Sequence, residues 1–119
     1  MHQSILVVDD DPLYVDLVRE VLATRNIPVI SGSNGKAALA VLEKEPVRLI
    51  ISDVDMPGMD GLAFHEHILA DERLKNIPFV FLTGSTDSRV AGYVREKNIR
   101  LINKSNLVFD LLSLISAVL

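Results

Sequence analysis

The stretch from Leu49 to Gly61, LIISDVDMPGMDG, joins a short apolar run to a carboxylate. Leu49–Ser52 has the length and composition of a buried β-strand, and Asp53 follows it directly. The earlier stretch ILVVDDDP repeats this arrangement, because the apolar run Ile5–Val8 is followed at once by Asp9. Two buried strands that both end in acids would bring like charges together, so we expect a site that uses those charges.

Strand-like runs alternate with helical patterns along the whole chain. Further strands are predicted at Val29–Ser31, Phe79–Leu82 and Arg100–Ile102. Helices are predicted from Pro12, over Gly35–Lys44, from Gly61 to about Asp71, over Ser85–Lys97 and over Leu107–Leu119, with Asp11, Ser33 or Asn34, and Asp60 as N-caps of the first three. This alternation predicts an α/β fold, in which a doubly wound parallel sheet has helices on both faces.

Length and composition narrow the class of protein. A chain of 119 residues corresponds to one domain, and 49% hydrophobic with 24% charged residues is ordinary for a globular protein. The absence of cysteine excludes disulfides and thiolate metal sites. No signal peptide and no run of membrane-spanning length is found, which predicts a cytoplasmic protein. The net charge of −4 and the lack of a Lys/Arg run argue against direct binding of nucleic acid. Binding to a membrane is not expected either.

The carboxyl ends of parallel strands meet at one edge of the sheet, where ligands bind in such folds. Five polar side chains follow predicted strands: Asp9, Asp10, Asp53, Thr83 and Lys104. Two carboxylates 4 Å apart repel by about 4 kcal/mol at an effective dielectric constant near 20, so the cluster needs a counter-ion. Mg²⁺ and a lysine would supply it. Such a site is equipped to accept a phosphoryl group on one carboxylate.

These residues resemble the receiver domains of two-component response regulators, the CheY-like superfamily, and the resemblance covers residues 1–119. The acidic pair is Asp9-Asp10, the acceptor motif is SDVDMPGMDG with Asp53, and Thr83 and Lys104 follow the fourth and fifth strands. The resemblance implies a flavodoxin-like fold with five parallel strands. It also implies a regulatory domain rather than an enzyme. This domain would either stand alone or form the N-terminal part of a longer regulator.

The resemblance also assigns roles to the site residues. Asp53 would take the phosphoryl group from a histidine kinase or a histidine phosphotransfer protein. Asp10, Asp53 and the backbone carbonyl of Asp55 would bind Mg²⁺, or Mn²⁺ in its place, and Asp9 would assist through water. Thr83 and Lys104 would stabilise the phosphoryl group and signal its presence. The fourth helix, fifth strand and fifth helix would contact an output domain or a partner protein.

Two positions depart from the family pattern. The lysine is usually followed by a proline after a cis peptide bond, but Lys104 is followed by Ser105. A cis bond there would cost about 2.5–4 kcal/mol, which favours a trans bond and a different loop. The aromatic switch residue of the family is replaced by Leu101, so an altered signal output is expected.

Two alternative functions use the same residues. Haloacid dehalogenase-like phosphatases also have an Asp-x-Asp motif, for which Asp53 and Asp55 would serve, but there the motif follows the first strand. A receiver that only docks, without phosphorylation, would be expected to lack some of the site residues. All five are present here.

The last helix and two histidines complete the expectations. Two apolar stripes, Leu107/Leu111/Leu114/Val118 and Val108/Leu112/Ile115/Leu119, indicate either a deeply covered helix or a surface for a homodimer or an output domain. His65 and His67 are two positions apart on a helix, so they cannot share a metal ion, and both are predicted at the surface.

Overall fold

The computed structural model of the chain describes residues 4–84 and 87–118. Within these residues, one sheet of five parallel strands has the order β2-β1-β3-β4-β5. The strands are β1 (Ser4–Val8), β2 (Val29–Gly32), β3 (Val47–Asp53), β4 (Phe79–Thr83) and β5 (Arg100–Asn103). This topology confirms the predicted doubly wound, flavodoxin-like α/β fold.

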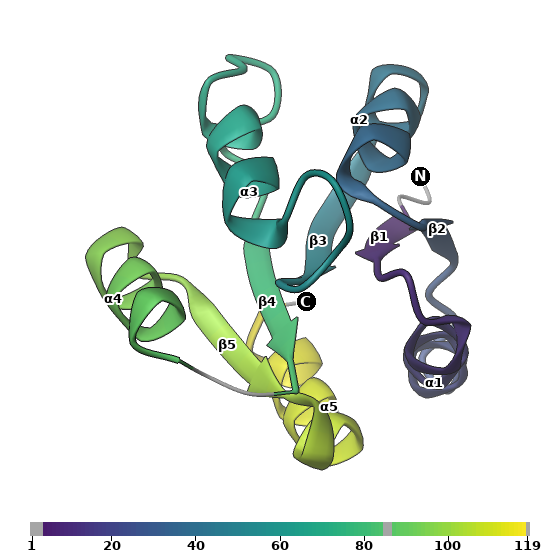
Figure 1. Cartoon of the computed structure of the whole chain (residues 1–119). Helices are drawn as coiled ribbons and strands as arrows, with labels where there is room; N and C mark the ends of the chain where they lie inside the picture. Colours follow the sequence, from purple (N-terminus) through teal and green to yellow (C-terminus); the bar gives the residue numbers. More distant parts are fainter. Residues whose placement is uncertain (1–3, 85–86, 119) are drawn as a thin grey trace.

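In the described part of the chain, five α-helices cover the two faces of the sheet (Figure 1). They are α1 (Pro12–Ala23), α2 (Gly35–Lys44), α3 (Gly61–Leu69), α4 (Ser88–Lys97) and α5 (Leu107–Val118). Helices α1 and α5 pack against one face, and α2, α3 and α4 against the other. No helix in residues 4–84 and 87–118 is long and apolar enough to cross a bilayer.

The continuous apolar runs are explained by burial on both sides of the sheet. In β1, Ile5 and Val7 belong to the core with α1 and α5, whereas Leu6 and Val8 belong to the core with α2 and α3. Successive residues of a strand point to opposite faces, so both sets must be apolar. The same demand on β3 explains why Leu49, Ile50 and Ile51 are all apolar and buried.

The helix starts follow the predicted caps with one exception. Asp11, Asn34 and Asp60 each accept a hydrogen bond from a backbone N–H in the first turn of the helix that follows. The start predicted at Ser85 is wrong, because α4 begins at Ser88, where Asp87 accepts a hydrogen bond from the Val90 N–H. Ser85 itself lies outside the described residues.

The wide apolar arc of α5 is mostly core. Leu107, Leu111, Leu114 and Ile115 are all buried between α5, the sheet and α1. Val108 and Phe109 are exposed at the start of the helix. The side chains of Val118 and Leu119 lie outside the described part of the chain, so the outer ends of the two predicted stripes are not placed.

Gly61 lets α3 begin directly against the end of β3. Its N–H donates to the Val54 carbonyl at 2.7 Å. A Cβ at this position would overlap the carbonyl oxygen of Asp53 and lie 2.8 Å from the Cα of Val54. Only a residue without a side chain allows this approach, so Gly61 fixes the loop next to Asp53.

Substitution of two glycines tests this role of Gly61. Gly61→Ala should lower the free energy of unfolding by about 1–3 kcal/mol, because backbone must move away from the added methyl group. Gly92→Ala is the matched control, since Gly92 is in a helix with open space around it. The control should raise the free energy of unfolding by about 0.5–1 kcal/mol. Urea unfolding measures both, and equal effects of the two substitutions would contradict the close approach.

Candidate functional site

The register of the sheet brings the polar strand ends to one level. Val8 of β1 pairs with Ser52 of β3, so the residues that follow them, Asp9 and Asp53, lie side by side. Asp53 pairs in turn with Leu82 of β4, and Thr83 is the next residue. Thr83 pairs with Asn103 of β5, which precedes Lys104. Residues far apart in the sequence therefore meet at the carboxyl edge of the sheet.

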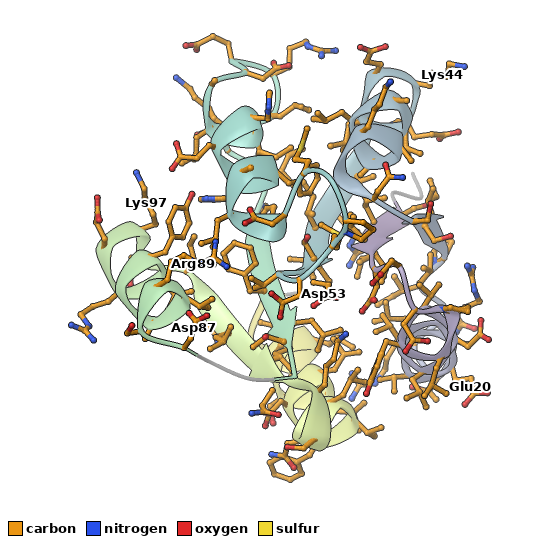
Figure 2. All side chains as sticks on the ribbon, in the orientation of Figure 1. Glu20, Lys44, Asp53, Asp87, Arg89 and Lys97 are labelled. Carbon is orange, nitrogen blue, oxygen red and sulfur yellow. The ribbon has the colours of Figure 1, made fainter. Side chains whose placement is uncertain are left out.

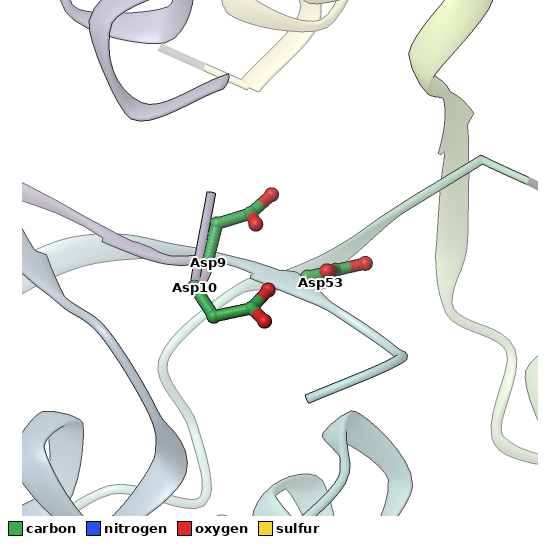
Figure 3. A group of neighbouring side chains, drawn as sticks. All are labelled: Asp9, Asp10 and Asp53. Carbon is green, nitrogen blue, oxygen red and sulfur yellow. The ribbon is translucent and has the colours of Figure 1, made fainter. Parts of the chain in front are cut away.

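Three carboxylates form the centre of this edge. Asp9, Asp10 and Asp53 each place an oxygen within 4.8 Å of the others. Figure 3 shows the three side chains pointing into the same space beyond β1 and β3. Asp9 and Asp53 are buried, whereas Asp10 is exposed. The cluster therefore has a buried floor and a side open to solvent.

Lys104 is the cation that balances the buried carboxylates. Its Nζ lies 3.0 Å from Asp9 Oδ2 and 3.3 Å from Asp53 Oδ2. It also lies 4.0 Å from the centre of the Tyr14 ring, a distance suited to a cation–π contact. Burial lowers the pKa of Lys104, but the hydrogen bond and charge of the two carboxylates outweigh it and hold this pKa above its ordinary value. Lys104 is therefore a fixed ammonium ion.

Asp53 lies in the most constrained position of the cluster. Its Oδ1 accepts a hydrogen bond from the Val54 N–H at 2.8 Å. Burial, followed by the charge of Asp9, raises the pKa of Asp53 from 3.8 to about 6, against the opposing effects of Lys104 and the Val54 N–H. The carboxylate is ionised at neutral pH but has lost much of its solvation.

The donor set suits a hard divalent cation. Asp9 Oδ1 accepts a hydrogen bond from the Asp11 N–H at 2.9 Å. Asp9 Oδ2, although buried, has no well-aligned hydrogen bond within the described residues, and its contact is the ion pair with Lys104. An exposed carboxylate, Asp10, lies next to two buried ones, which leaves room for water. Oxygen ligands of this kind, completed by water, fit Mg²⁺.

The remaining predicted residues border the cluster. Thr83 is fully buried at the end of β4. The side chain of Asp55 is exposed on the loop after β3. Leu101 is half-buried in β5 and packs against the apolar cluster that includes Phe81 and Val90. Only Thr83 and Asp55 thus lie at the edge of the sheet, while Leu101 lies on the α4 side.

The loop after β5 differs from the family pattern, as Ser105 led us to expect. The described residues contain no cis peptide bond, so Lys104–Ser105 is trans. Lys104–Asn106 forms a short 3₁₀ helix. Asn103 Oδ1 caps it by accepting from the N–H of Ser105 at 2.9 Å and from its hydroxyl at 2.8 Å. The side chain of Asn103 thus fixes the turn that places Lys104.

Sequence reasoning missed three residues near this edge or behind it. No site role was predicted for Tyr14, yet its ring lies under Lys104; its position one turn after the acidic run was the available signal. Asn103 precedes Lys104 and was not considered. The surface position predicted for His65 is wrong, because this side chain is 4% exposed, whereas His67 is exposed as expected. The helix pattern alone did not show that α4 covers His65.

The raised pKa of Asp53 predicts how stability changes with pH in the absence of divalent cations. The stability contributed by neutral Asp53 is fully present below pH 3.8 and is lost as the pH rises through about 6. Asp53→Asn should therefore be more stable than the wild type at pH 7, by about 2–3 kcal/mol, and nearly equal at pH 4. Urea unfolding in EDTA at both pH values measures this. A difference that does not change with pH would contradict the burial of an ionised Asp53.

Comparison with known proteins agrees with this geometry. Residues 5–113 match the family model of the response regulator receiver domain. The response regulator Rre1 of Synechocystis is 36% identical over 93 residues, which cover 76% of this chain and 40% of Rre1. This chain spans between 40% and 63% of the length of three of the curated relatives that it matches.

Solved structures show the same fold. The chemotaxis response regulator CheY4 of Vibrio cholerae has a TM-score of 0.88 and 27% identity, with 100% of both chains covered. The response regulator TrrA of Thermotoga maritima, in complex with Mg²⁺ and a beryllium fluoride, has a TM-score of 0.83 and 26% identity over 98% of this chain and 99% of TrrA. On the sequence match and this geometry together, the chain belongs to the response regulator receiver domains of two-component signalling systems.

Proposed function

We propose that this domain accepts a phosphoryl group on Asp53 and thereby changes its contacts with an output domain or a partner protein. The observation that supports this most directly is the position of Asp53. Its carboxylate is buried beside two other carboxylates and lies 3.3 Å from the ammonium group of Lys104. A carboxylate held this way has a fixed geometry, a nearby cation and an open side from which a donor can approach.

The reaction is a displacement at phosphorus. An oxygen of Asp53 forms a bond to phosphorus while the bond between phosphorus and the donor breaks, and the donor keeps the electron pair. A carboxylate is a weak nucleophile, so its fixed orientation and the screening of the incoming anion must supply the rate. The Val54 N–H orients Oδ1 of Asp53, and Lys104 offsets the negative charge of the incoming group.

We propose Asp10, Asp53 and the backbone carbonyl of Asp55 as the Mg²⁺ ligands, with Asp9 acting through water. When bound, Mg²⁺ would neutralise charge on the carboxylates and the phosphoryl oxygens. The fit rests on the three clustered carboxylates and on the buried Asp9 Oδ2, which lacks a well-aligned hydrogen bond within residues 4–84 and 87–118.

Thr83 and Lys104 are proposed to hold the phosphorylated form. The product would add about −1.5 to −2 charges at this edge, which favours hydrogen bonds from nearby donors. Thr83 follows Leu82, the residue of β4 that pairs with Asp53, so Thr83 lies on the strand next to Asp53. Leu101 has no ring with which to report a movement of Thr83, so the change should concern the segment after Thr83 and α4.

The partners follow from the same proposal. A histidine kinase or a histidine phosphotransfer protein would be the donor. Residues 1–119 would form one receiver domain, with α4, β5 and α5 as the surface for output, and the chain spans only part of its relatives. A homodimer is the alternative use of this surface, and Phe109, which is 69% exposed on α5, is the side chain to test for it.

Binding of Mg²⁺ should stabilise the fold, because a ligand that binds only the native state shifts the unfolding equilibrium. The midpoint of thermal unfolding should rise between EDTA and millimolar Mg²⁺. Asp10→Asn should abolish this rise and should itself raise the midpoint in EDTA, since it removes one of three repelling charges. Glu20→Gln, which removes an exposed charge from α1, is the control and should retain the rise. Identical wild-type melts with and without Mg²⁺ would refute the cation site.

Acetyl phosphate with Mg²⁺ should add one phosphoryl group to the wild type. Intact-mass spectrometry with peptide mapping should locate it on Asp53, and Asp53→Asn should take up none. Loss of Lys104, in Lys104→Met, should slow uptake, because the incoming anion loses its counter-ion. Asp55→Asn is the matched control and should still be modified, since only its backbone carbonyl is proposed to act.

Two outcomes would count against the receiver chemistry. Label on any residue other than Asp53, or uptake by Asp53→Asn, would contradict the assignment of the acceptor. Steady hydrolysis of p-nitrophenyl phosphate over many turnovers, lost in both Asp53→Asn and Asp55→Asn, would instead favour the haloacid dehalogenase-like phosphatase. A protein that docks its partners equally well as wild type and as Asp53→Asn would support the phosphorylation-independent alternative.

A further inference from the structure

Helix α4 has little apolar surface with which to pack on the sheet. Of its ten residues, all of which the structure describes, only Val90 is buried, and Ala91, Tyr93 and Val94 are half-buried. Gly92 is exposed in the middle of the helix, where a glycine lowers helix stability. The position of α4 must therefore depend on contacts other than apolar burial.

Polar contacts with α3 supply these interactions. Arg89, Tyr93 and Lys97 are spaced by four residues, so they lie on one face of α4. Arg89 Nη1 lies 2.9 Å from Asp60 Oδ2, the Tyr93 hydroxyl donates to Glu66 Oε1 at 2.9 Å, and Lys97 Nζ lies 3.8 Å from the same Glu66 oxygen. Figure 2 labels Arg89 and Lys97 along α4, beside α3.

Of the three contacts, the one made by Tyr93 also continues into the core. The two ion pairs involve side chains that are 32–55% exposed, and ion pairs open to solvent contribute little to stability. Tyr93 also contacts His65, whose Nδ1 lies 2.7 Å from the tyrosine hydroxyl oxygen. His65 is buried among aromatic rings, 4.5 Å from Phe79 and 5.9 Å from Phe81 between ring centres. A buried imidazole needs a hydrogen-bond partner, and Tyr93 provides it.

The direction of these hydrogen bonds follows from the number of protons. The hydroxyl of Tyr93 has one proton, which it donates to Glu66. His65 must therefore donate from Nδ1 to the tyrosine oxygen, which gives a chain from His65 through Tyr93 to Glu66. Burial lowers the pKa of His65, and burial together with Glu66 raises the pKa of Tyr93, so both side chains keep this protonation at neutral pH. Chains of this kind strengthen each bond in them.

The hydrogen-bond chain from His65 to Glu66 is connected to the acceptor site through β4 and α3. Phe81 lies two residues before Thr83 on the same strand, and its ring is 6.1 Å from that of Tyr93. Leu101 belongs to the same apolar cluster as Phe81 and Tyr93. Asp60, which Arg89 contacts, caps α3 immediately before the glycine that touches Asp53. Movement at Asp53 or Thr83 would thus reach Tyr93 through packed residues.

We propose that Tyr93, through its hydroxyl, is the positioning residue that holds α4 against α3 in the resting state. We further propose that occupation of the Asp53 site acts on α4 by breaking the contacts of Tyr93, in place of an aromatic side chain at position 101. The second statement rests on the proposed function, whereas the first does not.

Hydrogen–deuterium exchange of the backbone amides of α4 tests both statements. Tyr93→Phe keeps the ring but removes both hydrogen bonds, so α4 should exchange about tenfold faster than in the wild type. Glu20→Gln, which removes an exposed charge from α1, is the control and should leave exchange in α4 unchanged. With Mg²⁺ and beryllofluoride, exchange of the wild type should rise to that of Tyr93→Phe, so that the two no longer differ.

A second variant guards against a nonspecific effect of Tyr93→Phe. Glu66→Gln weakens the acceptor of the same chain and should also speed exchange in α4. The double variant should exchange no faster than Tyr93→Phe alone, because both changes act on one set of contacts. If the double variant exchanged faster than Tyr93→Phe alone, by the sum of the two single effects, the hydrogen bonds of Tyr93 and Glu66 would not act as one unit.

The remaining outcomes separate this inference from the proposed function. Equal exchange of α4 in the wild type and Tyr93→Phe, without beryllofluoride, would overturn the positioning role of Tyr93 whether or not Asp53 is an acceptor. A wild type that binds no beryllofluoride would contradict the proposed function and the second statement. A wild type that binds it with α4 exchange unchanged would overturn the second statement alone.

Discussion

The site depends on the repulsion between buried carboxylates at one edge of the sheet. Asp9 and Asp53 are buried, Asp10 lies beside them, and Lys104 is within 3.3 Å of both buried groups. The oxygens of the three carboxylates lie within 4.8 Å of one another, and two like charges at about this distance repel by several kcal/mol even at an effective dielectric constant near 20. One ammonium group does not balance three carboxylates. The three carboxylates therefore leave an excess of negative charge at this edge, which a divalent cation would offset.

The fold supplies the rigidity that this arrangement needs. β1, β3 and β4 are covered on both faces, so their carboxyl ends cannot move apart without loss of core packing. Gly61 lets α3 begin against the backbone of Asp53, and Asn103 fixes the turn that presents Lys104. The opposite situation holds for α4, which has one buried residue and polar contacts with α3. A rigid acceptor site beside a weakly packed helix is a suitable arrangement for a signalling domain.

Much of this could be predicted from the sequence because the determining patterns are local. The apolar runs of Ile5–Val8 and Leu49–Ser52 specify strands covered on both faces, and the acids after them mark one edge of a parallel sheet. The burial of His65 could not be predicted, since it depends on Tyr93 of another helix and on two rings of β4. The start of α4 was misplaced because the sequence before it holds several residue types that can cap a helix, and the pattern alone does not show that Asp87 takes this role by accepting from the Val90 N–H.

Calorimetric titration of Mg²⁺ into the wild type and into Lys104→Met tests the central claim, that Lys104 is the resident counter-ion of the acidic cluster, most directly. If Lys104 neutralises Asp9 and Asp53, its removal leaves a more negative site, and Lys104→Met should bind Mg²⁺ several-fold more tightly although its apo form is less stable. Weaker binding of Mg²⁺ by Lys104→Met, or an apo form as stable as the wild type, would contradict the account.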